Sequence, residues 1–214
     1  TALAATVREQ YDAYKANPVG YFDSAELMEL DTMIGGHGVN NIELVKTLCE
    51  NSADAVEWLK TIDIDLSSVG FAGGASVKRI HRPVDEEGKV LAVGAYIVPR
   101  LEAACTSNEN ITILTNTLAN TILTKDGAAC GVVATGKDGE TVTVNAKAVL
   151  LATGGFGANS EMVESYKPEL KGFMTTNAPG AQGQGIVMAQ AIGADTVDME
   201  QIQIHPTVQF DTAA

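Results

Sequence analysis

The stretch AVLLATGGFGAN, residues 148–159, is the part of the sequence that decides the fold. It starts as a short apolar run of the kind that is buried in a sheet, and it leads directly into Thr153, Gly154 and Gly155. Because glycine has no Cβ, such a turn lets the backbone approach a ligand closely. Open α/β folds bind nucleotides at turns of this kind, at the carboxyl end of a strand. A tight strand-to-helix turn without a ligand fits the same residues.

The segment before this stretch is divided into short, β-branched pieces, from about residue 110 onward. Asp-Gly pairs at 126–127 and 138–139 separate these pieces and are typical of hairpin turns. The pattern predicts a small antiparallel β-meander that leads into a buried final strand at 148–153.

The rest of the sequence has mainly helical patterns. Apolar residues recur at intervals of three and four, and cap residues such as Ser24 and Asn41 precede two of the segments. The helices expected on this basis are 2–15, 25–34, 42–62, about 94–105, one from about 160, and 186–194. A glycine-rich connector, residues 70–82, lies between the third and the fourth. Together with the meander, these helices predict an α/β fold in which one domain covers most of the chain.

Composition excludes several classes of protein. The chain has 214 residues, of which 45% are hydrophobic and 19% charged, as in a folded globular domain. Its formal net charge of −13 and its lack of a basic stripe argue against nucleic-acid binding. No apolar run reaches the roughly 18 residues of a membrane span, and no signal peptide is visible. The cysteines lack metal-ligand spacing, so isolated buried thiols and no metal site are expected at Cys49, Cys105 and Cys130.

Two glycine-rich segments are further candidates for ligand binding. The loop TTNAPGAQGQG, residues 175–185, precedes a helix whose N-terminal amides favour a phosphate. A flexible surface loop is the other interpretation. The connector at 70–82 gathers basic side chains that can contact a phosphate or a carboxylate, and a solvated turn is the alternative. These side chains are Lys78, Arg79, His81 and Arg82.

His205 stands in an apolar, alternating stretch near the end of the chain. A lone histidine in such a strand is usually a core residue whose hydrogen bonds are satisfied. Pro206 breaks the strand directly after it, which favours a ring that points outward at a domain edge. Both interpretations follow from the residues.

Five motifs together resemble the soluble fumarate-reductase flavoproteins, in order and in spacing, from about Ser24 to Thr207. They are ELMELDTMIGGHGVNNIELVKTLCENSADAVEWL, GGASVKRIHRP, LLATGGFGANSEMV, LKGFMTTNAPGAQGQG and QIQIHPT. The resemblance implies the central part of a Rossmann-like FAD-binding domain over residues 1–199. Residues 200–214 are then the start of a capping, substrate-binding domain. A GxGxxG fingerprint does not occur in the sequence, so an incomplete fragment of a longer flavoprotein is expected.

The resemblance also implies site residues. Thr153, Gly154 and Gly155 match a flavin-contacting turn near the adenosine and the pyrophosphate, and Ile122 matches a strand position whose backbone meets the adenine. The loop beside the isoalloxazine corresponds to Gly73, Gly74, Ala75 and Ser76. Gln184 stands where many relatives have an acidic residue, which weakens the assignment there. Ala72 stands where fumarate-specific relatives tend to have methionine, which points to a substrate larger than fumarate. His205 matches the histidine that holds the substrate carboxylate.

The implied reaction is hydride transfer from reduced FAD to the β-carbon of a small α,β-unsaturated carboxylate such as fumarate. The family's proton-donating arginine has no counterpart in this chain, so no catalytic residue is assigned within it. Electrons would come from a donor protein or domain, and the compartment, cytoplasmic or exported, stays open. The alternatives are a urocanate, steroid or other enoate reductase or dehydrogenase, a non-catalytic flavin-domain remnant, and an unrelated α/β domain.

Overall fold

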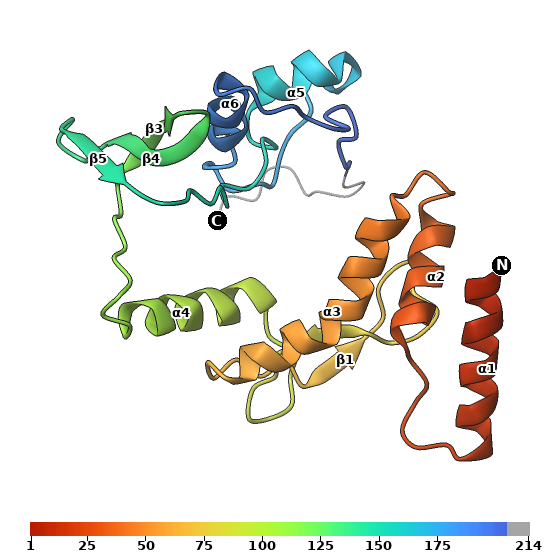
Figure 1. Ribbon diagram of the computed structural model, residues 1–214. Coiled ribbons are helices and arrows are strands. Elements are labelled where there is room, and N and C mark those ends of the chain that lie inside the picture. Colours follow the sequence, from red (N-terminus) through yellow and green to blue (C-terminus); the bar gives the residue numbers. More distant parts are fainter. Residues whose placement is uncertain (205–214) are drawn as a thin grey trace. The chain divides into compact units, whose positions relative to one another are not determined.

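The computed structural model describes residues 1–204, and the chain divides into two compact units, Thr1–Ile113 and Leu114–Ala214 (Figure 1). The first unit contains four helices and a two-stranded sheet, and the second contains a three-stranded sheet and shorter helices. Helices and antiparallel sheets together confirm the expected mixed α/β class.

Three capped helices build the first half of unit 1. They are α1 (Ala2–Ala16), α2 (Ala25–Gly35) and α3 (Ile42–Lys60), and α2 packs against both of the others. The Ser24 side chain accepts a bond from the Leu27 N–H, and the Asn41 side chain accepts from the amides of Glu43 and Leu44. Both residues thus satisfy amides that a helix start leaves free, as the sequence predicts. The expected helices agree with the observed ones to within two residues.

After these helices in the sequence, two very short strands pair at the two ends of the glycine-rich connector. Strand β1 (Ser68–Gly70) pairs antiparallel with β2 (Ile80–Arg82), so that Gly70 lies opposite Ile80. The sequence pattern did not predict this pair, since three residues are too few for a visible alternation. Helix α4 (Val93–Thr106) follows as expected and contains Pro99. Within residues 1–204 no helix is both long and apolar enough to cross a membrane.

Unit 2 begins with the expected β-meander. Strands β3 (Leu118–Lys125), β4 (Ala128–Thr135) and β5 (Thr141–Asn145) pair antiparallel in the order β3-β4-β5. Asp126 and Gly127, between β3 and β4, both have positive φ, 52° and 79°. Two successive positive φ angles are the mark of a hairpin turn whose twist matches that of its strands. Residues 111–117, which were expected to start the meander, are not part of a strand.

The expected final strand at 148–153 is the main difference from the sequence prediction. These residues form no strand, and Leu150 is 91% exposed. A strand needs a neighbour to bond its backbone, and within residues 1–204 no other segment pairs with this one. The prediction of a buried strand here was therefore wrong for this chain. Helices α5 (Ser160–Tyr166), η1 (Pro168–Leu170) and α6 (Gln184–Ala191) complete the described part of the unit.

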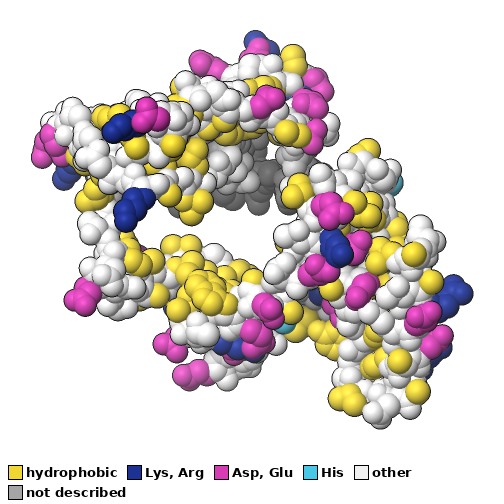
Figure 2. Space-filling model, viewed as in Figure 1, with side chains coloured by type: hydrophobic (Ala, Val, Ile, Leu, Met, Phe, Trp, Pro, Cys, Tyr) yellow, Lys and Arg dark blue, Asp and Glu magenta, His cyan; other side chains and the backbone are white. Residues whose placement is uncertain are grey.

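Within residues 1–204, few side chains are fully buried in either unit. The buried hydrophobic side chains belong to Val45, Cys49, Ile64, Leu66, Ile122, Ala134, Leu170 and Met188. Large apolar side chains remain on the surface, as the yellow areas of Figure 2 show on both units. All three cysteines are free, and Cys49 is buried as expected, whereas Cys105 and Cys130 are half-buried. Burial, with the nearby charge of Glu29 in the same direction, raises the pKa of the Cys49 thiol, so this cysteine is not an activated nucleophile.

Candidate functional site

The turn Thr153–Gly155 exposes bare backbone in unit 2. Gly154 has a φ of +69°, a conformation that side chains other than glycine rarely adopt. A Cβ placed on Gly154 or on Gly155 would meet no atom within 4 Å. The backbone of this turn is therefore open to a ligand, with no side chain of its own in the way.

The glycine-rich loop at 175–185 lies directly against this turn. The Gly183 N–H donates to the Gly155 carbonyl at 3.2 Å, and the Ala158 N–H donates to the Ala181 carbonyl at 2.9 Å. The Asn159 side chain adds a bond from its Nδ2 to the Gln182 carbonyl, at 3.0 Å. Two segments that the sequence presents separately thus form one hydrogen-bonded structure.

Close packing explains why glycine occurs at positions 183 and 185, on either side of the first residue of α6 (Gln184–Ala191). Gly183, the residue before α6, has a φ of +79°, and a Cβ there would lie 2.6 Å from the sulfur of Met162. A Cβ on Gly185 would lie 2.0 Å from the Thr153 Oγ1. The side chain of Thr153 therefore rests on the first turn of α6. That turn contains Gln184 and no acidic residue, so the partly positive end of α6 favours an anion.

Two cavities adjoin this paired structure. A cavity of about 270 Å³ is lined by residues from the turn, from α6 and from the segment after it, among them Thr153, Gly154, Gly185 and Asp195. A second cavity, of about 450 Å³, is lined by Gly155, by residues 173–177 and by residues 198–199 and 201–204. The polar run Thr175–Asn177, which borders it, is the beginning of the loop at 175–185 that the sequence indicated as a ligand-binding candidate.

Ile122 belongs to the same unit. Its side chain is buried, and its strand, β3, is at the edge of the meander and contacts α6. One edge of β3 has no strand beside it within the described residues, so backbone groups are available there. Unit 2 therefore contains Ile122, the turn Thr153–Gly155 and Gln184.

The remaining cofactor candidates, Gly73–Ser76, form a turn in unit 1. Gly74 has a φ of +84°, and the Ala75 N–H donates to the Ala72 carbonyl at 3.2 Å, as in a type II turn. A Cβ on Gly73 or Gly74 would meet nothing within 4 Å. This turn, like the one in unit 2, presents open backbone.

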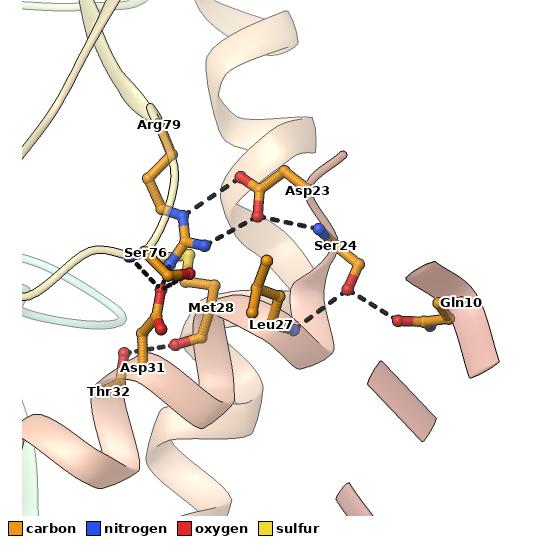
Figure 3. Close-up of polar contacts among 9 residues, drawn as sticks. All are labelled: Gln10, Asp23, Ser24, Leu27, Met28, Asp31, Thr32, Ser76 and Arg79. Carbon is orange, nitrogen blue, oxygen red and sulfur yellow. Dashed lines mark hydrogen bonds and ion pairs between the residues drawn. The ribbon is translucent and has the colours of Figure 1, made fainter. Parts of the chain in front are cut away.

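The basic side chains of the connector contact different groups within the chain. Arg79 pairs with the carboxylates of Asp23 and Asp31 at 2.8 Å each, so its guanidinium is bound within the chain (Figure 3). His81 donates from Nδ1 to the Leu66 carbonyl at 2.9 Å, and Lys78 lies 5.9 Å from the ring centre of Phe71. Arg79 and His81 thus have structural partners, which neither interpretation of the cluster anticipated.

His205 lies outside the described residues. Of the residues that lead to it, 198–199 and 201–204 line the cavity beside Gly155. Within residues 1–204 no three side chains of His, Cys, Asp or Glu are arranged to hold a metal ion.

Comparison with known proteins identifies a sequence family. The profile described as "FAD binding domain" matches residues 11–213. The NADH:fumarate oxidoreductase of Klebsiella pneumoniae is 42% identical over 194 residues, which are 91% of this chain and 20% of that protein. A fumarate reductase (cytochrome) of Shewanella frigidimarina is 43% identical, over 87% of this chain and 32% of the relative. The urocanate reductase of Eggerthella lenta is 37% identical, over 91% and 32%.

Solved structures give the same result. The open conformation of a flavocytochrome c3 fumarate reductase has a TM-score of 0.81 and 37% identity, over 91% of this chain and 34% of that one. A 3-ketosteroid-Δ4-(5α)-dehydrogenase from Rhodococcus jostii RHA1 has a TM-score of 0.72 and 26% identity, over 85% and 43%. The chain thus spans between a fifth and a third of the length of the three reductases from Klebsiella, Shewanella and Eggerthella.

Proposed function

This chain belongs to the FAD binding domain family, and from that premise we propose that the whole protein reduces the C=C bond of a small α,β-unsaturated carboxylate. FAD is the cofactor of the family. The relatives named for fumarate and urocanate reduction support this class of substrate. The observation that carries the proposal is the hydrogen-bonded pair of glycine turns in unit 2, with a cavity of about 270 Å³ beside them.

The residues of this pair fit the diphosphate of FAD. Backbone without Cβ at Gly154 and Gly155 allows phosphate oxygens to approach the chain. The N-terminus of α6 supplies partly positive amides and carries no acidic side chain in its first turn. We assign the pyrophosphate and adenosine to Thr153–Gly155, Gln184 and the edge of β3 near Ile122. The isoalloxazine is assigned to the Gly73–Ser76 turn.

The chain's residues have defined tasks in this proposal. Once reduced by the electron donor, bound FAD would supply the hydride for the β-carbon of the substrate and be reoxidised. His205 orients the substrate carboxylate, and residues 1–199 act as flavin domain while 200–214 begin the capping domain. No residue of this chain is assigned as the acid that protonates the product. An electron-donor protein or domain delivers the electrons.

The first test uses the full-length protein. We expect visible flavin absorbance in the purified sample and reoxidation of the reduced flavin by fumarate, by urocanate or by a bulkier enoate. A colourless protein that binds no added FAD would contradict the assignment and favour a non-catalytic remnant. Flavin that no enoate reoxidises would leave the cofactor in place and contradict the reaction.

Replacement of His205 by alanine should lower kcat/KM for the enoate by roughly ten- to hundredfold, because a hydrogen bond to a charged carboxylate is lost. Both substrate binding and turnover should weaken, which steady-state kinetics measures. His37 provides a control: it is exposed and has a φ of 53°, which asparagine tolerates. His37→Asn should leave the kinetics unchanged. Unchanged kcat and KM in the His205 variant would show that the assignment is wrong.

A larger substrate is the second candidate, and Ala72 favours it. Ala72 is a small, half-buried residue at the start of the Gly73–Ser76 turn. Ala72→Met should fill space and shift the kcat/KM ratio toward fumarate, relative to a bulkier enoate, by about tenfold. Ala53→Met, on the exposed surface of α3, is the matched control. An unchanged ratio would remove Ala72 from the substrate pocket.

A further inference from the structure

A carboxylate from a helix that is far away in the sequence is hydrogen-bonded to the Gly73–Ser76 turn. Oδ2 of Asp31, in α2, accepts from both the backbone N–H and the hydroxyl of Ser76, at 2.9 Å each. The same oxygen accepts from Nη1 of Arg79 at 2.8 Å. One atom of α2 therefore receives three hydrogen bonds from the connector (Figure 3).

Arg79 extends this attachment to the start of the helix. Its Nη2 donates to Oδ1 of Asp23 at 2.8 Å and its Nε donates to Oδ2 of the same residue at 3.2 Å. The Arg79 side chain is only 10% exposed, and that of Asp31 is 13% exposed. Charge-assisted bonds in such a partly buried place are stronger than those of a solvated pair. The planar guanidinium can bond two carboxylates at once, which a lysine ammonium does with less defined geometry.

Helix α2, which contains Asp31 and begins shortly after Asp23, is itself held in place by hydrogen bonds. Ser24 caps α2 through the Leu27 N–H at 3.1 Å, and its hydroxyl donates to Oε1 of Gln10 in α1 at 2.9 Å. The Ser24 N–H donates to Oδ1 of Asp23, which holds that carboxylate toward Arg79. Asp31 thus projects from a capped helix that packs against α1 and α3, and Asp23 directly precedes the cap residue of that helix.

The turn has little else to fix it. Among the described residues, the other hydrogen bonds of segment 71–79 are the turn bond from Ala75 to Ala72 and the bond from the Arg79 N–H to Gly70. Gly73, Gly74 and Ser76 are exposed. A glycine turn without attachment has many conformations, and each one that does not bind flavin lowers the apparent affinity.

We propose that Asp31 and Arg79 are positioning residues that hold the Gly73–Ser76 turn in its flavin-binding conformation. The inference rests on the proposed function, because it takes this turn to face the flavin. Neither residue needs to touch the cofactor. Their role is to organise the turn in advance, so that binding does not have to order it.

The test is Asp31→Asn in the full-length protein. The substitution keeps an acceptor oxygen for Ser76 and removes the charge that Arg79 meets. If the competent turn falls to roughly a tenth of the population, the apparent Kd for FAD rises about tenfold. Fluorescence titration of the apoprotein measures this, and the visible circular dichroism of the flavin at saturation reports the environment of the ring. We expect the Kd to rise and the dichroism at saturation to match that of the wild type, because bound flavin selects the competent turn; Arg79→Lys, which keeps the charge, should raise the Kd as well.

Glu57→Gln is the matched control, since it removes one negative charge from the exposed Glu57–Lys60 pair on α3. It should leave the Kd and the spectrum unchanged. A wild-type Kd in Asp31→Asn would overturn the inference and leave the proposed function standing. A lower melting temperature with an unchanged Kd would also overturn it, because the role would then be structural alone. A wild-type protein that binds no FAD would overturn the proposed function and this inference with it.

Discussion

Replacement of Gly185 by alanine is expected to raise the Kd of the full-length protein for FAD by roughly a hundredfold, equivalent to about 3 kcal/mol. The added Cβ would lie 2.0 Å from the Thr153 Oγ1 and 3.1 Å from the Thr153 Cβ. Rotation about χ1 moves the hydroxyl but leaves the Cβ of Thr153 in place, and β-branched side chains are stiff at χ1. Either α6 or the glycine turn must therefore shift, and the backbone that we assign to the diphosphate shifts with it.

Equilibrium titration of the apoprotein with FAD measures this effect. Gly180→Ala is the matched control in the same loop, because a Cβ there meets nothing within 4 Å. It should bind FAD like the wild type. Thr153→Ala combined with Gly185→Ala removes the hydroxyl and should recover part of the lost affinity. Wild-type affinity in the Gly185 variant would show that the cofactor site lies elsewhere.

Replacement of Gly131 by alanine should destabilise the β-meander by about 3 kcal/mol. Gly131, in β4, lies opposite Asn145 of β5, and a Cβ on it would be 2.3 Å from the Val144 carbonyl oxygen. It would also be 3.2 Å from the Asn145 Cα. Both are backbone atoms, so the clash is relieved only by separating β4 from β5 and losing their hydrogen bonds.

Urea unfolding of the full-length protein, without FAD, gives the change in the free energy of unfolding. Gly136→Ala is a suitable comparison, because the nearest atoms there belong to the flexible end of the Glu140 side chain. That side chain can swing into solvent, so this variant should lose much less stability. Equal losses in the two variants would contradict the packing argument.

Local signals in the sequence were sufficient for most of the elements. The cap residues Ser24 and Asn41 mark helix starts, and the Asp126–Gly127 pair marks a hairpin, because each acts through atoms only a few residues away. The segment at 148–153 was mispredicted for the opposite reason. Its apolar residues are typical of a strand that lies beside another strand, and the described residues provide no such neighbour.

The candidate site shows the same division. The open backbone at Gly154 and Gly155 follows from the absence of Cβ, so the sequence alone pointed to it. The bond between Gly183 and Gly155 joins two loops and has no signature in either. The hydrogen bond from Ser76 to Asp31 joins residues 45 positions apart. In the sequence, nothing distinguishes Asp31 from any other acidic residue of a helix. Partners at such separations are fixed by tertiary structure, which no local pattern encodes.

The unpaired segment before the glycine turn, residues 148–153, affects the tendency of the isolated chain to aggregate. Leu150 is 91% exposed and Leu151 38% exposed, next to backbone that no strand of the described residues pairs with. An exposed apolar segment with unpaired backbone groups can pair with a second copy of itself. We therefore expect self-association of the isolated chain to increase with protein concentration. A lysine in place of Leu150 is the kind of gatekeeper that natural edges use against aggregation.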